Sequence, residues 1–204
     1  LLQKIKKDYG QGKVVTEALR GVDLKLVKGD FTVMMGPSGS GKSTLLNIIG
    51  GLDRATSGKA IINGQDIGSL SNKALSLMRR NNIGFVFQNY NLIPVLTAYE
   101  NAEYVLMLQG ITPLQRREKV MNLLQEIGLD GLENRFPREL SGGQQQRVAI
   151  ARAVASDPQL VLADEITANV DSETAQSLLE LMVALNKNSN TTFLFSTHDP
   201  AVIK

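Results

Sequence analysis

The chain has 204 residues, of which 43% are hydrophobic and 21% are charged, enough for one large domain with a buried core or for two small ones. These proportions exclude a disordered, collagen-like or fibrous chain. Lys and Arg total 22 and Asp and Glu total 20, so the net charge of +2 argues against a broad nucleic-acid-binding face, although it leaves a local basic patch open. The absence of Cys and the single His exclude disulfide frameworks, Cys nucleophiles and His-rich metal sites.

No segment is expected to span a membrane. The longest uncharged stretch, from Asn81 to Tyr99, has about the length of a span, but it contains Gln88, four Asn and Pro94 and is too polar. No signal peptide is visible. Because the chain starts at Leu1 without a Met, we expect a trimmed N-terminus and a soluble protein whose membrane role, if any, comes through a partner.

Strand and helix patterns alternate along the chain, which predicts an α/β fold. Alternation predicts a half-buried strand over Val22–Leu26, and an apolar run that ends in a Gly-rich turn predicts another over Phe31–Met35. Asp53 to Leu70 is rich in Gly, Ser and Asn, so short strands and turns are expected there. Later apolar runs predict three buried strands: Ile83–Phe87, Leu160–Ala163 and Thr192–Phe195.

Several helix starts are marked by their capping residues. Thr97 and Glu100 have the spacing of a capping box, and Thr112 precedes a proline at the first helical position. After Ser172, apolar residues recur at helical spacing: Ala175, Leu178, Leu179, Met182 and Leu185. We expect a single domain over residues 1–204, in which 1–88 and 157–204 form a mostly parallel sheet core with a small antiparallel β portion. A helical subdomain over about 89–156 is inserted into that core.

The segment Gly36–Ser43 fits the phosphate-binding loop pattern. Its glycines permit a tight loop whose backbone N–H groups point at phosphate oxygens, and a helix that begins near Lys42 adds the positive end of its dipole. Lys42 would supply a charge between the β- and γ-phosphates, and Ser43 a hydroxyl ligand for Mg²⁺. A Gly-rich turn with a chance lysine is the alternative, but an apolar strand before the loop and an apolar helix after it favour nucleotide binding. The expected phosphate contacts are Gly36, Ser38, Gly39, Ser40, Gly41, Lys42, Ser43 and Thr44.

Two carboxylates end the apolar strand Leu160–Ala163. In P-loop enzymes such an Asp holds Mg²⁺ directly or through water, a role that we assign to Asp164. Glu165 would point to the opposite side if the strand geometry continued, where it could polarise a water in line with the γ-phosphate. The alternative is that the two residues are ordinary solvated acids at the end of a strand. The presence of a phosphate-binding loop in the same chain disfavours that interpretation.

A second glycine motif, Leu140–Gln144, directly precedes the helical pattern Gln145–Ala155. Ser141 is a natural N-cap and Gln144 completes a capping box, so a well-capped helix is one sufficient explanation. The two glycines between them also leave the backbone bare at the dipole-positive helix start, which makes a second anion site. A single bound triphosphate has no evident use for two such anion sites in the same chain. Two chains arranged head to tail could use both, because the second site of one chain would face the nucleotide bound to the other.

Together these motifs resemble the nucleotide-binding subunit of ATP-binding cassette (ABC) transporters, which implies a P-loop NTPase core. The resemblance covers essentially the whole chain, and its motifs occur in the family's order and spacing: the P-loop, Gln88, Leu140–Gln144, Leu160–Glu165, Asp171 and His198. In that family the signature of one subunit closes over ATP held by the other, so the resemblance implies nucleotide contacts in trans from Ser141, Gly142, Gly143 and Gln144. The segments Leu45–Asp53 and Asn91–Ala98 are similar to those of the lipoprotein-releasing and macrolide-export type.

The resemblance also implies roles for single residues. Tyr9 would stack on adenine, although a strand tyrosine at the surface is the alternative. Gln88 would sense Mg²⁺ and the attacking water, which makes it both a metal and a catalytic candidate, and His198 would contact the γ-phosphate. Asp171 would belong to the nucleotide site.

Some residues depart from the family pattern. Ile166 stands where the family usually has Pro, Ala168 replaces a usual Gly and Val170 a usual Leu. Family members normally continue for some tens of residues beyond the position of His198, so we expect that the C-terminus is truncated.

The resemblance thus implies an ATP hydrolase that uses Mg-ATP, dimerises around two nucleotides and powers an integral membrane permease. Glu165, His198 and Gln88 are its expected catalytic residues, and Ser43, Gln88 and Asp164 its expected Mg²⁺ ligands. The protein would be cytoplasmic and peripheral on the inner face of the cell membrane, with no nucleic acid partner. One alternative is an ABC-type ATPase that signals mechanically through a membrane protein without transport. An ABC-type ATPase acting on DNA or ribosomes is disfavoured, since the chain has no long coiled-coil insertion or second cassette.

Overall fold

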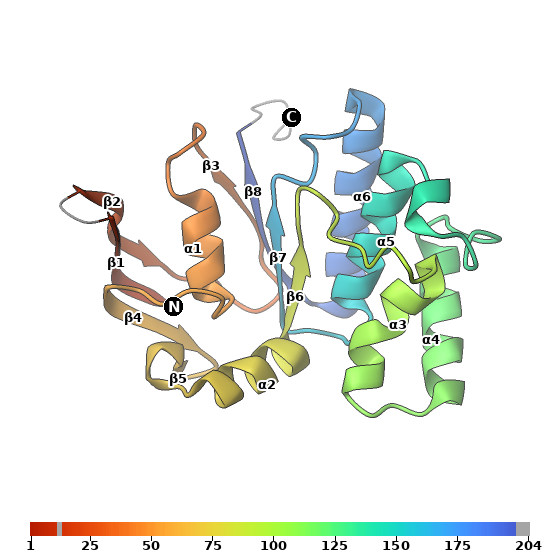
Figure 1. Ribbon diagram of the computed structural model, residues 1–204, viewed down its shortest axis with the longest axis horizontal. Helices are drawn as coiled ribbons and strands as arrows, with labels where there is room; N and C mark the ends of the chain where they lie inside the picture. The colour runs from red at the N-terminus through yellow and green to blue at the C-terminus, as the bar shows by residue number, and fades with distance from the viewer. Residues whose placement is uncertain (12–13, 199–204) are drawn as a thin grey trace.

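The structure, a computed structural model, describes residues 1–11 and 14–198 and contains two sheets (Figure 1). The first sheet is antiparallel and has the strand order β2-β1-β4-β5. Its strands are β1 (Leu2–Gln11), β2 (Val14–Leu24), β4 (Ser57–Ile62) and β5 (Gln65–Asp66). The last two fall in the Gly-, Ser- and Asn-rich segment, so the expected short strands and turns are confirmed there.

The second sheet is parallel and has the strand order β3-β8-β7-β6. Its strands are β3 (Phe31–Met35), β8 (Thr192–Thr197), β7 (Leu160–Asp164) and β6 (Ile83–Val86). All six residues of β8 are buried, as expected for a strand with neighbours on both sides and cover on both faces. The four strands run the same way, so the segments that follow them meet at one edge of the sheet (Figure 1). These segments contain the glycine loop, His198, Glu165 and Gln88.

The predicted α/β fold, with a parallel sheet and a smaller antiparallel portion, is confirmed, but several predicted strand bounds are wrong. The strand predicted from Val22 begins at Val14, because β1 pairs with it from there. The strands predicted to end at Ala163 and Phe195 continue to Asp164 and Thr197, which still pair with their neighbours. The first predicted strand extends to Leu26, whereas β2 ends at Leu24, because Leu24 already pairs with Leu2 and residues 25 and 26 have no strand beside them. The strand predicted to end at Phe87 stops at Val86, which is the last β6 residue paired with β7.

Six α-helices pack around and beside the parallel sheet in the described part of the chain. The capping boxes predicted for Thr97 and for Ser141 are present, and both threonine and serine hydroxyls accept from the backbone N–H three residues on. Between β6 and β7 the chain is mostly helical (Figure 1). The helices are α1 (Lys42–Ile49), α2 (Asn72–Asn82), α3 (Ala98–Leu108), α4 (Pro113–Glu126), α5 (Gly142–Val154) and α6 (Ser172–Ser189), and the 3₁₀ turns are Ile67–Ser69 and Pro137–Glu139.

Three clusters of buried apolar residues fix these elements in place. The first joins the antiparallel sheet to α1 and the near face of the parallel sheet, around Ile48 and Leu162. The second joins the other face of that sheet to α5 and α6, around Phe195 and Met182. The third holds α3, α4 and α5 together. Since a fully buried side chain of this size contributes about 1.5–3 kcal/mol, the second and third clusters hold the C-terminal half of α5 between the parallel sheet and the helices α3 and α4.

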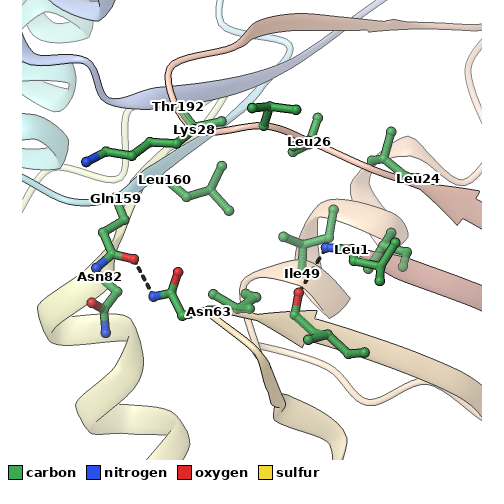
Figure 2. A pocket seen from close by; sticks show the side chains of 14 residues that line it. Leu1, Leu24, Leu26, Lys28, Ile49, Asn63, Asn82, Gln159, Leu160 and Thr192 are labelled. Carbon is green, nitrogen blue, oxygen red and sulfur yellow. Dashed lines mark hydrogen bonds between the residues drawn. The ribbon is translucent and has the colours of Figure 1, made fainter.

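A cavity of about 350 Å³ lies between the two sheets, beside the first residues of β7 and β8 (Figure 2). Its walls are mostly apolar, with Leu24, Ile49 and Leu160 among them, and the Asn63 amide donates to the side-chain oxygen of Gln159 at its rim. The cavity is therefore at the opposite edge of the parallel sheet from the glycine loop. Among the described residues, none of the helices has the length and apolar character needed to cross a bilayer.

One buried side chain in α5 lacks hydrogen bonds. Gln146 is fully buried, and within the described residues neither its Nε2 nor its Oε1 has a partner. Since an unsatisfied buried polar group costs about 1–3 kcal/mol, we expect that Gln146→Met raises the free energy of unfolding by about 1 kcal/mol, measured by urea denaturation. Gln145→Met is the matched control, because the Gln145 amide donates to the carbonyl oxygen of Leu140 at 3.1 Å. A Gln146→Met variant no more stable than the wild type would show that the amide is satisfied in solution.

Candidate functional site

The loop between β3 and α1 has the geometry of an anion site. Gly39 and Gly41 have φ angles of +78° and +91°, and a Cβ at Gly41 would lie 2.6 Å from the carbonyl oxygen of Ala18, so only glycine fits there. Gly41 is the N-cap of α1, and no side chain caps the helix. The N–H groups of the first turn therefore remain available to an anion, where the helix dipole also favours negative charge.

Lys42 is folded back onto this loop. Only 6% of the residue is exposed, and its ammonium donates to the carbonyl oxygens of Gly36 at 2.8 Å and Pro37 at 3.0 Å. The same nitrogen lies 3.3 Å from Oε1 of Glu165. A buried cation with these partners marks the place where phosphate oxygens would find a preformed positive charge.

The two carboxylates after β7 have different partners. Asp164 is the last residue of β7, and its Oδ1 accepts from the Ser196 hydroxyl at 2.5 Å. At Glu165 the chain leaves the strand with φ +47°, a left-handed conformation that is costly for a residue with a side chain. This turn directs the Glu165 carboxylate to Lys42 and His198, so the two acids have different partners. The strand geometry on which the predicted opposite orientation depended does not continue past Asp164.

His198 completes this cluster after β8. Its Nδ1 lies 3.2 Å from Oε2 of Glu165, and its side chain is 52% exposed. The structure thus brings together three residues that are far apart in the sequence. Lys42 is the first residue of α1, Glu165 follows β7, and His198 follows β8. A polarisable carboxylate between a buried ammonium and an imidazole is suited to orient a water and to accept its proton.

Ser196 is a residue of the site that the sequence analysis did not single out. Its hydroxyl donates to Asp164, while its Oγ and its carbonyl oxygen accept from the backbone N–H of Glu165 at 3.2 and 3.1 Å. Ser196 therefore fixes the Asp164 carboxylate and the backbone of Glu165 relative to β8. The signal that points to it is its position beside Asp164 in the parallel pairing of β7 with β8.

Tyr9 lies in β1 and is 44% exposed, but it is held by residues outside the glycine loop. Its hydroxyl donates to Asp53 at 2.8 Å, and the Lys7 ammonium lies 4.8 Å from its ring centroid. Burial raises the pKa of Asp53, but hydrogen bonds from Lys7 and Tyr9 outweigh this and hold that pKa below its usual value. The ring is thus fixed and available, and adenine stacking stays a prediction.

The predicted magnesium ligands fit the ion in chemistry. Ser43 is exposed on the first turn of α1, which packs against β7, where Asp164 ends the strand. Gln88 is exposed after β6, and its carbonyl oxygen accepts from the Asn169 amide at 3.0 Å. Mg²⁺ prefers hard oxygen ligands and usually takes only one or two from protein, with the rest from phosphates and waters. In residues 1–11 and 14–198 there is no group of three His, Asp or Glu that could hold a metal, so phosphate oxygens would have to complete the site.

The signature residues stand apart from the phosphate-binding loop of their own chain. In the described residues, no hydrogen bond or ion pair joins Ser141, Gly142, Gly143 or Gln144 to the loop at Gly36–Ser43. Ser141 instead caps α5 and accepts from the Gln144 N–H at 3.3 Å. The start of this helix is therefore formed, with Ser141 exposed and Gly142–Gln144 partly exposed, and it has no partner from its own loop.

Asp171 and two of the three departures from the family pattern have structural explanations, whereas nothing in the structure explains Ala168, which is exposed. Asp171 is the N-cap of α6, where the backbone N–H and the hydroxyl of Thr174 hold the pKa of the carboxyl below its usual value. Ile166 is 1% exposed and packs in the second core cluster, against which Val170 also lies. Apolar packing thus anchors the segment between Glu165 and Asp171.

Comparison with known proteins decides the family. The profile described as ABC transporter matches residues 19–168. This chain belongs to the ABC transporter family. Over 200 residues it is 50% identical to the lipoprotein-releasing system ATP-binding protein LolD 1 of Rhodopseudomonas palustris, covering 97% of this chain and 88% of that protein. Over 203 residues it is 44% identical to the macrolide export ATP-binding/permease protein MacB of Marinobacter nauticus, covering 100% of this chain and 31% of that protein.

A solved structure extends this result to the fold and the ligand. A dimeric, post-hydrolysis state of an ATP-binding cassette bound to ADP and Pi superimposes on this ABC subunit with a TM-score of 0.91 at 43% sequence identity, covering 98% of this chain and 88% of that one. Within the family this chain is therefore an ATP-binding and ATP-hydrolysing cassette of the lipoprotein-release and macrolide-export type.

Proposed function

We propose that two copies of this chain close head to tail around two Mg-ATP and that hydrolysis powers an integral membrane permease. The observation that carries the proposal is the meeting of Lys42, Glu165 and His198 at the phosphate-binding loop. Support for the dimer comes from the dimeric cassette bound to ADP and Pi, and support for the membrane partner from the ATP-binding/permease protein MacB. The protein would work at the inner face of the membrane.

In this proposal the loop binds the triphosphate through the glycine backbone and Lys42, while the signature of the second copy covers the γ-phosphate. Mg²⁺, held by Ser43, Gln88 and Asp164 together with phosphate oxygens, would neutralise part of their charge. Glu165 orients a water and accepts its proton as the water oxygen bonds to the γ-phosphorus. The bond from that phosphorus to the β–γ bridging oxygen breaks, which leaves ADP and inorganic phosphate. Backbone donors and Lys42 stabilise the developing charge.

Hydrolysis then removes the γ-phosphate contacts, and the dimer opens. We propose that residues 1–88 and 157–204 act as the nucleotide-binding core and that about 89–156 act as a helical subdomain that moves relative to it. The part of this subdomain from Gln88 to Leu108 would pass the motion to the permease.

Lys42→Ala tests the binding site. Loss of a charge-assisted contact worth about 1.5–3 kcal/mol is expected to weaken ATP binding about 10- to 150-fold, measured by equilibrium titration with a fluorescent ATP analogue. Lys73→Ala is the matched control, because Lys73 is exposed at the start of α2. Unchanged affinity and turnover in Lys42→Ala would refute the assignment of the phosphate site.

A further inference from the structure

The short segment that follows β6 is tied to two other parts of the chain. Arg152, in the last turn of α5, donates from Nη1 to the Asn91 carbonyl oxygen at 2.6 Å and from Nη2 to that of Tyr90 at 2.9 Å. The Asn169 amide, from the segment after Glu165, donates to the Gln88 carbonyl oxygen at 3.0 Å. Gln88, the residue proposed to sense Mg²⁺ and the attacking water, thus lies in a segment held by the signature helix on one side.

The bonds from Arg152 hold a backbone that would otherwise relax. Tyr90 and Asn91 have φ angles of +59° and +49°, a left-handed conformation that is unfavourable for residues other than glycine. Burial lowers the pKa of Arg152, and in the part of the chain that the structure describes no carboxylate pairs with it. The rigid guanidinium group therefore donates hydrogen bonds to two neighbouring carbonyl oxygens in a fixed geometry. A lysine ammonium does not have this planar, two-pronged arrangement of donors.

The same segment also touches the opposite end of the helix. A Cβ at Gly142, the first residue of α5, would lie 2.8 Å from the Tyr90 hydroxyl oxygen, so the tyrosine ring ends against the signature. Tyr90 is thus held by its carbonyl near the C-terminal end of α5 and by its ring at the N-terminal end. Because an α-helix moves as a rigid rod, a shift of this segment displaces the signature with it.

We propose that Arg152 is a positioning residue that makes α5, and therefore Ser141–Gln144, follow the segment that carries Gln88. The inference rests on the proposed function: occupancy of a chain's own phosphate site, read by Gln88, sets the position of the signature offered to the second copy. Arg152 touches neither nucleotide nor water in this scheme. Its effect is a coupling between two ATP sites, and couplings of this kind typically amount to about 5- to 150-fold.

A second arginine on the same helix provides the matched control. Arg147 donates from Nη1 to the Ile127 carbonyl oxygen at 2.5 Å and from Nη2 to the Ser177 hydroxyl at 2.8 Å. It therefore anchors α5 to the end of α4 and to α6, and has no bond to the segment after β6. Arg147→Lys removes a similar fork from the same helix without touching the proposed connection.

The test compares Arg152→Lys with Arg147→Lys in the full chain. Three quantities are measured: affinity for a non-hydrolysable ATP analogue at low protein concentration, turnover at saturating ATP, and the Hill coefficient of turnover against ATP. For Arg152→Lys we expect an analogue affinity within about 2-fold of wild type and a turnover that is lower by about 10-fold or more. The Hill coefficient is expected to fall to about 1. Arg147→Lys is expected to keep wild-type turnover and Hill coefficient below its unfolding temperature.

Equal turnover and Hill coefficients in the two variants would overturn the inference, as would a loss of analogue affinity in Arg152→Lys as large as its loss of turnover. If Arg152→Lys does not fold, Arg152→Gln replaces it, because a neutral amide buries no charge and can still donate to one carbonyl oxygen. The same pattern of retained affinity and lost cooperativity is expected. A wild-type turnover that does not depend on protein concentration would instead refute the proposed dimer, which keeps the two failures distinct.

Discussion

Glu165→Gln is expected to bind Mg-ATP and to lose turnover by about 10²- to 10⁴-fold, the range of a lost general base. The amide keeps the size of the side chain, and the backbone N–H of residue 165 can still donate to Ser196, so the left-handed turn is preserved. What is lost is the carboxylate that lies between Lys42 and His198. Glu118→Gln is the matched control, because Glu118 is exposed on α4, outside the site.

The same variant is expected to accumulate the closed dimer. Each bound ATP touches both chains in the proposed complex, so ligand binding and association are linked, and unhydrolysed ATP holds the dimer together. Loss of a negative charge beside the γ-phosphate favours closure further. Size-exclusion chromatography with Mg-ATP should show a stable dimer for Glu165→Gln and only a transient one for the wild type. A Glu165→Gln variant with wild-type turnover would remove the catalytic role from Glu165 and leave Asp164 and His198 as the candidates.

The cluster of Lys42, Glu165 and His198 could be predicted because each residue comes shortly after an apolar run that is recognisable as a buried strand. Parallel strands bring the segments after them to one edge, whatever their order in the sheet. The bonds from Ser196 depend on that order, because Ser196 reaches Asp164 and Glu165 only when β8 lies beside β7. Local sequence patterns do not encode which strands are neighbours, so this residue remained unassigned.

Elements without a clear pattern were not predicted. Helix α2 has a short apolar face, in which Leu75 and Met78 pack against the first core cluster, but most of its other residues are polar and the face was too short to be singled out. The hydrogen bond that holds the Tyr9 hydroxyl is accepted by Asp53, which is 44 residues away and is brought to β1 by the turn before β4. The end predicted for β2 was wrong for a related reason, since the alternation of apolar and polar residues continues through Lys25 and Leu26 after the partner strand has ended. In each case contacts distant in sequence, rather than local propensity, decide the outcome.

Ser141→Arg is expected to leave ATP binding to a single chain nearly unchanged and to abolish hydrolysis. No hydrogen bond or ion pair joins Ser141 to the phosphate-binding loop of its own chain among the described residues, so a new side chain there does not reach its own nucleotide contacts. In the head-to-tail dimer the same side chain would stand over the partner's ATP and block the composite site that it enters, so a dimer with Arg at both positions has no working site. Ser71→Arg is the matched control, because Ser71 is the exposed N-cap of α2 and accepts from the Ala74 N–H at 3.2 Å. Both substitutions lose a cap worth about 1 kcal/mol, but only Ser141→Arg should lose turnover.

A mixing experiment decides whether the site is shared between chains. A dimer of one Lys42→Ala chain and one Ser141→Arg chain places both defects in one composite site and leaves the other site intact. If hydrolysis needs a phosphate-binding loop from one chain and a signature from the other, two inactive variants should become active when mixed. Random pairing makes half of the dimers mixed with one good site each, so about a quarter of wild-type turnover is expected if each site works independently. Coupling between the sites, as inferred for Arg152, would lower this value without removing it. No activity above that of the separate variants, at concentrations where the wild type is fully active, would contradict a site built from two chains.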